Sequence, residues 1–159
     1  MGFRDLNLQR RYSGQAGELA REFYIPVLSE ARLYDRQAGY FDSAMLVQVA
    51  AGLASFIRHV LEDSSPQAAG RPAIRLIAGA GWREADVKAF HAGHEIFMQN
   101  LGKNLSGKFE PTDEECLRLG LPPGWRPEED QIAAHRLATL AWLAARGLLE
   151  IKVALPVNE

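Results

Sequence analysis

The chain has 159 residues, of which 47% are hydrophobic and 24% are charged, and its formal net charge is -2. These values are typical of one globular domain with one core, and they exclude a disordered or fibrous chain. No apolar run reaches the roughly 18 residues of a membrane-spanning helix, and the charged N-terminus is unlike a signal peptide. The balanced charge gives no general attraction to nucleic acid or to anionic membrane. We therefore expect a soluble, cytoplasmic protein with no membrane partner.

The first forty residues are predicted to form an arm, a helix and a strand. Residues 1–15 show no sustained apolar period and are expected to be an N-terminal arm. Apolar spacing predicts a helix over 16–31, and Pro26 should kink it because proline removes a backbone donor. The segment 33–41 is predicted to be a strand. Gly39 within that strand indicates a bulge or a close approach by other backbone or a ligand.

The next forty residues are predicted to contain a helix and a second strand. Asp42 and Ser43 are favourable N-cap residues, and apolar spacing then predicts a helix over 43–61. The apolar run 74–78 predicts a buried strand. The glycine-containing residues 79–81 predict a tight turn from that strand into the next helix.

The second half of the chain is predicted to add two long helices and a last strand. Apolar spacing predicts helices over 83–101 and 132–145, and the second is apolar on more than half of its circumference, which implies burial on two sides. Between them lies an acidic helical insert, about 103–130. Its part 110–130 has a net charge of -5, which leaves +3 on the remaining residues. The alternating segment 150–155 predicts a strand.

The order of these elements predicts the fold class. Strands separated by helices are typical of an α/β fold, with a parallel or mixed sheet flanked by helices. We therefore expect 33–41, 74–78 and 150–155 to lie in one sheet.

The single cysteine, Cys116, cannot form an internal disulfide, which is typical of proteins in a reducing cytoplasm. It is expected on the surface of a short helix that the capping box of Thr112 and Glu115 begins. Acidic neighbours disfavour its thiolate, so we do not expect a reactive thiol.

The histidines form no familiar metal or catalytic pattern. His91 and His94 are three residues apart, whereas the known zinc helices place histidines four apart. The glycines of 79–81 lack the remainder of a phosphate-binding fingerprint. We therefore predict no metal site, no cofactor and no catalytic residue, and the residues alone support only an α/β domain.

Five segments are informative in their order and spacing: LNLQRRY (6–12), FYIPVLS (23–29), YDRQAGYF (34–41), IRLIAG (74–79) and LEIKVALP (149–156). Together they resemble the phospholipase-D-like (HKD nuclease) domain at the N-terminus of bacterial SNF2- and DEAD/DEAH-type helicases, some of which are linked to restriction and phage defence. The likeness covers nearly the whole chain and is weakest in the acidic insert. It implies that 16–159 is a single, partial phospholipase-D-like domain that is incomplete at its C-terminus.

The resemblance implies metal-independent hydrolysis of phosphodiester bonds by paired H-x-K-x4-D motifs. One His attacks phosphorus, a second protonates the leaving oxygen, and Lys holds the phosphate. None of the four histidines of this chain has Lys two residues later. In relatives the motif follows soon after the segment that matches 150–156. No catalytic residue is therefore carried over, and the chain is expected to be inactive alone.

Two residues are expected near the substrate on the same resemblance. Arg36 and Ser43 lie in elements that resemble those flanking the phosphate pocket of the family. Ser43 begins a helix whose free N–H groups could face an anion, although the charge of Asp42 would compete for them. Ordinary capping and surface charge are the alternative interpretation.

Three functional hypotheses follow. The leading one is an N-terminal fragment of a helicase-associated nuclease that reaches nucleic acid through the full-length protein and its helicase domain. The second is a non-catalytic module that docks a helicase onto DNA or a partner, and the third is a free-standing protein that reuses half of the fold. We also expect self-association, with a homodimer as the candidate form, or an exposed apolar edge near Ile151 to Leu155.

Overall fold

A parallel sheet forms the centre of the fold. The computed structural model of the chain describes residues 2–12, 14–63, 71–101 and 110–155. The strands, in the order in which they neighbour one another, are β1 (Tyr34–Phe41), β2 (Ile74–Trp82) and β3 (Leu149–Val153). Both neighbouring pairs are parallel. The predictions of an α/β fold and of these three segments in one sheet are confirmed.

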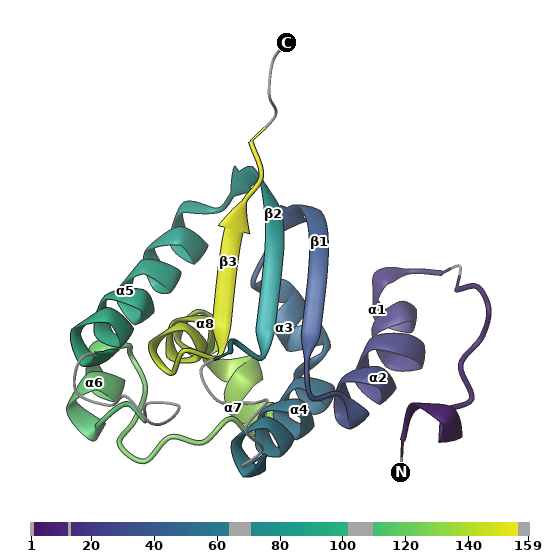
Figure 1. The fold of residues 1–159 in the computed structure, drawn as a ribbon, viewed down its shortest axis with the longest axis horizontal. Coiled ribbons are helices and arrows are strands. Elements are labelled where there is room, and N and C mark those ends of the chain that lie inside the picture. The colour runs from purple at the N-terminus through teal and green to yellow at the C-terminus, as the bar shows by residue number, and fades with distance from the viewer. Residues whose placement is uncertain (1, 13, 64–70, 102–109, 156–159) are drawn as a thin grey trace.

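Helices precede the sheet and connect its strands. In chain order they are η1 (Phe3–Asp5), α1 (Ala16–Leu19), η2 (Ala20–Tyr24), α2 (Ile25–Glu30), α3 (Ala44–Gln48), α4 (Ala50–Glu62), α5 (Glu84–Leu101), α6 (Asp113–Arg118), α7 (Glu129–Ala134) and α8 (Arg136–Ala145). In Figure 1 they lie behind, below and beside the strands, and no helix of the described residues crosses in front of the sheet.

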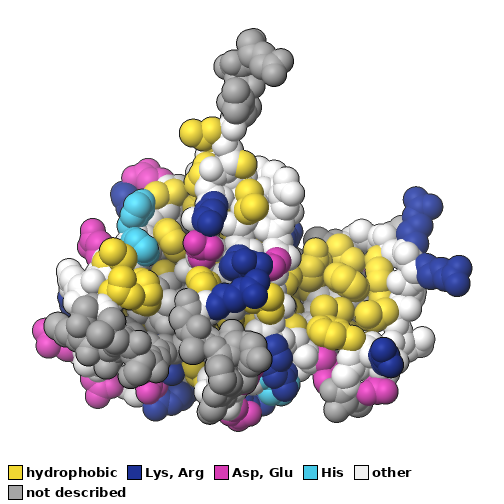
Figure 2. Space-filling view, in the orientation of Figure 1, with side chains coloured by type: hydrophobic (Ala, Val, Ile, Leu, Met, Phe, Trp, Pro, Cys, Tyr) yellow, Lys and Arg dark blue, Asp and Glu magenta, His cyan; other side chains and the backbone are white. Residues whose placement is uncertain are grey.

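The two faces of the sheet therefore differ. Successive side chains of a strand point to opposite faces. On β2 the side chains of Ile74, Leu76 and Ala78 are buried against the helices. The alternate residue Ile77 lies on the opposite, open face, where 45% of its surface is exposed. Figure 2 shows this open face with charged and apolar side chains side by side over the strands.

The core lies between the covered face of the sheet and the helices. Helix α8 is buried on all sides over 139–145, so the prediction of two-sided burial for this helix is confirmed. Helix α5 packs on α8 at Gly93, where a Cβ atom would collide with the carbonyl oxygen of Ala141. The two helices therefore approach closely because this position has no side chain.

The prediction of a tight turn at 79–81 is wrong. Strand β2 continues through these residues to Trp82. The pairing register of β1 and β2 shifts near Gly39, and a Cβ atom at Gly79 would collide with the carbonyl oxygen of Gly39. The glycines thus permit a bulge in the ladder, as the prediction for Gly39 allowed.

Two helices that were predicted to be continuous are interrupted. The helix over 43–61 breaks at Val49 (φ -110°, ψ 14°), and that over 132–145 breaks at His135 (φ -121°, ψ 40°). The irregularity expected at Pro26 takes the form of the π-helical turn η2, directly before the helix whose first turn contains this proline. Proline has no backbone N–H to donate, and the π-helical turn accommodates this loss by a change in the hydrogen-bond pattern.

The acidic insert belongs partly to the core. Its residues 103–109 lie outside the described part of the chain. Helix α6 begins with the predicted capping box of Thr112 and Glu115. Cys116 is buried at 4% exposure rather than on the surface, so that prediction is wrong. Trp125 is buried as well, because the irregular chain after α6 folds back onto α8 and brings its ring within 5.1 Å of Trp142.

Candidate functional site

The carboxyl ends of β1 and β2 bring together a group of polar side chains. This edge is where open α/β sheets bind their ligands. Strand β1 is followed by Asp42 and Ser43, and β2 is followed by Arg83. Helix α8 contributes Arg136 at its first position.

Asp42 is the centre of this polar group. Its Oδ2 lies 2.7 Å from Nη2 of Arg83, and its Oδ1 lies 3.9 Å from Nη1 of Arg136. Arg83 also donates from Nε to the hydroxyl of Tyr40, at 3.2 Å. These partners, Tyr40 first and Asp42 second, raise the pKa of Arg83. Two guanidinium groups share the carboxylate of Asp42, and the charge of a second carboxylate, Asp86, also acts on Arg83.

A buried carboxylate, that of Asp86, binds the backbone next to Asp42. The backbone amide of Ser43 donates to Oδ2 of Asp86 at 3.1 Å. Both residues are buried, at 0% and 1% exposure. The Ser43 hydroxyl has no hydrogen-bond partner among the described residues. This contact ties the beginning of α3 to the first turn of α5.

The two residues expected near the substrate occupy different environments. Ser43 is inside the fold, and its hydroxyl does not cap α3. Asp42 instead accepts from the amide of Ala44 at 2.8 Å, so its carboxylate does take a donor that an anion would need. The guanidinium of Arg36 lies against Sδ of Met45, at 3.2 Å, and over the ring of Tyr24, 5.6 Å from its centroid.

Arg36 also affects a half-buried tyrosine, Tyr34. Burial raises the pKa of Tyr34, and the positive charge of Arg36 opposes that rise. Arg36 therefore joins β1 to η2 and α3 by packing. No hydrogen bond joins Arg36 to Ser43 in the described part of the chain.

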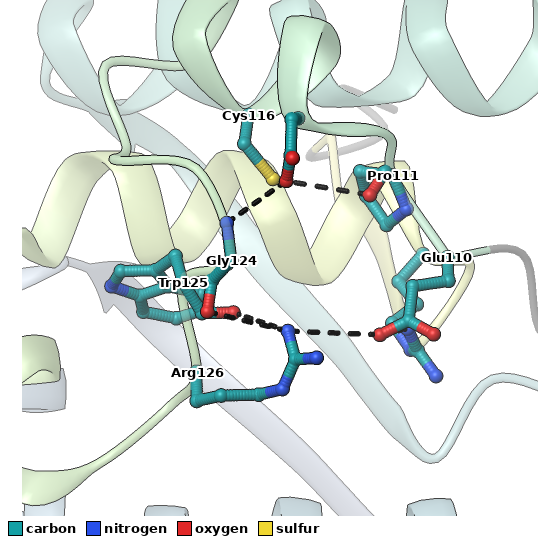
Figure 3. Close-up of polar contacts among 8 residues, drawn as sticks. Glu110, Pro111, Cys116, Gly124, Trp125 and Arg126 are labelled. Carbon is teal, nitrogen blue, oxygen red and sulfur yellow. Dashed lines mark hydrogen bonds and ion pairs between the residues drawn. The ribbon is translucent and has the colours of Figure 1, made fainter.

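A second polar cluster surrounds Glu110, which lies in the insert (Figure 3). Oε1 of Glu110 lies 3.1 Å from Nη1 of Arg146 and 4.0 Å from Nη1 of Arg126. Arg146 is only 8% exposed, and its guanidinium lies 5.3 Å from the centroid of the Trp142 ring. Burial lowers the pKa of Arg146, and Glu110 opposes that effect. The cluster fixes the insert to the end of α8.

The Cys116 thiol lies beside this cluster. Its Sγ is 3.9 Å from the carbonyl oxygen of Pro111. Burial raises the pKa of the thiol, and the charges of Asp113 and Glu115 raise it further. The predicted effect of the acidic neighbours is confirmed in direction, although burial is the larger cause. The thiolate is therefore disfavoured at neutral pH.

The histidines are distributed over three places. His59 lies on α4, His91 and His94 lie on α5, and His135 lies between α7 and α8. His94 stacks on Phe90, with the ring centroids 5.9 Å apart. Within the described ranges, no three His, Cys, Asp or Glu side chains are grouped closely enough to hold a metal ion.

Sequence reasoning missed Arg83, Asp86 and Arg136. Arg83 had a usable signal, because it follows a strand directly, but the strand was predicted to end four residues too early. Asp86 is a buried acid in the first turn of a helix, and Arg136 reaches the site only through the break at His135. Nothing in the local sequence indicates those two positions.

No protein-family model, curated protein or solved structure matches the chain. Over the part of the chain that the structure describes, no helix is both long and apolar enough to cross a membrane. The fold and the site thus define an α/β protein in which Arg83 and Arg136 lie beside Asp42 at the carboxyl ends of the strands.

Proposed function

We propose that this chain is the N-terminal module of a helicase-associated, phospholipase-D-like nuclease. In this proposal it supplies the scaffold and phosphate contacts but not the catalytic His and Lys residues. Its partners would be nucleic acid and a helicase domain in the same polypeptide, in the cytoplasm. The observation that carries the proposal is the pair Arg83 and Arg136, which meet at the carboxyl edge of the sheet.

The arrangement of the resembling segments supports the proposal. Three of the five, 34–41, 74–79 and 149–156, contribute the three strands of one parallel sheet. These three segments build the sheet at whose carboxyl end the candidate site lies, whereas 6–12 and 23–29 lie outside the sheet.

The chemistry of the edge fits a phosphate group. A guanidinium presents a planar set of donors that matches phosphate oxygens. The side chains of Arg83 and Arg136 are 54% and 38% exposed, while that of Asp42 is 20% exposed. A phosphodiester could thus approach the arginines while Asp42 holds them in place.

The histidines do not fit a catalytic role in this chain. Phosphodiester cleavage in the resembled family needs one His as nucleophile and another as acid, each beside a Lys. His59, His91 and His94 lie within helices, and none is at the end of a strand. Chemistry would therefore depend on residues that this chain does not contain.

A non-catalytic docking module is the second candidate function. The open face of the sheet favours it, because the exposed Ile77 lies among paired charges there. Arg75 donates from Nε to Asp35 across the strands at 2.7 Å, and Arg75 pairs in register with Glu150. In this case a helicase domain would pack on the open face.

Two measurements test the proposal. The coding sequence after Glu159 should contain H-x-K followed by helicase motifs; helicase motifs without H-x-K would favour the docking module. Fluorescence anisotropy with a labelled single-stranded oligonucleotide should detect weak binding at low salt, because few cations contribute.

Substitutions at the edge make the binding test specific. Arg83→Ala and Arg136→Ala should each weaken oligonucleotide binding several-fold. Arg58→Ala, which removes an exposed arginine on α4, should leave binding unchanged. Equal losses in all three variants would mean that binding depends on overall charge and not on this site.

A further inference from the structure

Strand β3 forms one edge of the sheet, and its outer side has no strand partner among the described residues. The amide of Ile74 donates to the carbonyl of Leu148, and the amide of Ala154 donates to the carbonyl of Ala78, both at 2.8 Å. Alternate residues of a strand direct their backbone groups to the same side. The even-numbered residues 148–154 therefore bond to β2.

The odd-numbered residues direct their backbone groups outward. The N–H and C=O groups of Leu149, Ile151 and Val153 point to the free edge. Exposed edges are usually blocked by proline, a bulge or charged side chains, lysine above all. Within Leu149–Val153 there is no proline, the register against β2 is regular, and the charge of Lys152 is matched by Glu150 of the same strand, 3.5 Å away. This edge is therefore able to accept another strand.

The strand is complementary to a second copy of itself. In an antiparallel arrangement centred on Ile151, Leu149 lies opposite Val153 of the second copy, and Ile151 lies opposite its own equivalent. These apolar side chains share the covered face of the sheet. On the open face, Glu150 lies opposite Lys152 of the second copy. Both opposite-charge pairs and apolar pairs stabilise neighbouring strands.

The hydrogen-bonding pattern fits the same register. In an antiparallel ladder, directly opposed residues exchange both backbone hydrogen bonds at alternate positions. The outward groups belong to Leu149, Ile151 and Val153, and these are the residues that would pair across the two-fold axis. Every outward donor and acceptor of the strand would then have a partner.

Apolar surface lies beside this edge. Val153 is 51% exposed and Leu155 is 72% exposed. Helix α5 runs beside β3 in Figure 1. On it Phe97 lies against Gly147, two residues before the strand begins. A partner strand would cover part of this surface.

We propose that a second copy of this chain binds along β3, with residues Leu149–Val153 of both copies antiparallel about a two-fold axis at Ile151. The resulting sheet has the strand order β1-β2-β3-β3-β2-β1. This interface is independent of the proposed function, because it needs no contact with nucleic acid or with the arginines at the carboxyl edge.

Charge reversal tests the register. Lys152→Glu places two carboxylates opposite each other at both symmetric positions, and Glu150→Lys does the same with two ammonium groups. Each single variant should raise the dimer dissociation constant on the order of tenfold. The double variant E150K/K152E restores opposite charges and should dimerise nearly as well as the unmodified chain.

Sedimentation velocity over a concentration series of the 159-residue chain measures this constant. Circular dichroism of each variant checks that the monomer remains folded. A monomer at every concentration up to about 1 mM would overturn the proposal. Dimerisation that is equal in all four proteins would overturn it too, because the interface would then lie elsewhere.

A cross-link tests the same axis without relying on charge. Opposed residues of a hydrogen-bonded pair have Cα atoms about 5.5 Å apart, which is within disulfide range. In a Cys116→Ser background, Ile151→Cys should give a covalent dimer on mild oxidation. Gln37→Cys, on the open face of β1, is the control and should not. Equal cross-linking of the two variants would contradict the arrangement.

Discussion

The backbone amide of Ser43 donates a hydrogen bond to the carboxylate of Asp86, 3.1 Å away, and both residues are buried. The two residues are 43 positions apart in the chain. Their contact joins the segment that follows β1 to the helix that follows β2. It therefore fixes the relative position of Asp42 and Arg83, which form the candidate site above it.

Asp86→Ala should destabilise the fold. The substitution leaves the amide of Ser43 buried without its acceptor, which costs about 1–3 kcal/mol. The free energy of unfolding, measured by urea titration, gives the result. Glu84→Ala is the matched control, because Glu84 is exposed on the same helical turn and pairs with the exposed Lys88; it should cost less than about 0.5 kcal/mol. Similar losses of unfolding free energy in both variants would mean that the buried contact contributes no more than an exposed ion pair.

Gly93→Ala should separate α5 from α8. The added methyl group would meet the carbonyl oxygen of Ala141, which is backbone and has little freedom to move. Overpacking of this kind typically costs about 1–3 kcal/mol. Gly17→Ala is the contrasting variant, because Gly17 lies in α1 with open space around it and alanine favours a helix there. Thermal unfolding should show a lower midpoint for the first variant and an unchanged or higher midpoint for the second.

Glu115 should make stability depend on pH. Burial tends to raise its pKa, but hydrogen bonds from the Thr112 backbone, the Asn100 amide and the Thr112 hydroxyl lower it overall. A carboxyl whose pKa is lower in the folded state stabilises the fold above its unfolded pKa, about 4.3, and loses this effect as the pH falls through the folded value.

Glu115→Gln removes this titration. The variant should be less stable than the unmodified chain at pH 7, and the difference should shrink below about pH 4. Urea midpoints measured from pH 7 down to pH 2.5 provide the comparison. A difference that stays constant over this range would mean that Glu115 contributes by packing rather than by its charge.

The strands were predictable because they are short apolar or alternating runs between clear helices. The segments 33–41, 74–78 and 150–155 needed only their local pattern to be recognised. The extension of β2 through 79–81 was not predictable from that pattern. It depends on a shift of the pairing register near Gly39 of the neighbouring strand, forty residues away in sequence, where the absence of a side chain at Gly79 lets the two backbones approach closely.

The buried face of α5 could not be predicted from the sequence for a related reason. Its large side chains, such as Phe90 and Phe97, suggest the inward face, yet they are only half-buried. The most buried residues of this helix are one apolar residue, Ile96, and three small or polar ones, Asp86, Gly93 and Asn100. Their burial follows from contacts with α3, α6 and α8, which local periodicity does not contain. Arg136 was missed because it reaches Asp42 only through the packing of the helices, whereas Arg83 was missed because β2 extends further than its apolar run.

The measurement that tests the central proposal most directly is a nuclease assay in the presence of EDTA. It compares residues 1–159 with a version extended along its own gene, on single- and double-stranded DNA and on RNA. The 159-residue chain should show no cleavage, because removing a nucleophile and acid that act together costs several orders of magnitude in rate. The extended version should cleave without metal and should lose activity when the His of its H-x-K is replaced. Metal-independent cleavage by the 159-residue chain, or no cleavage by an extended chain that contains H-x-K, would contradict the proposal.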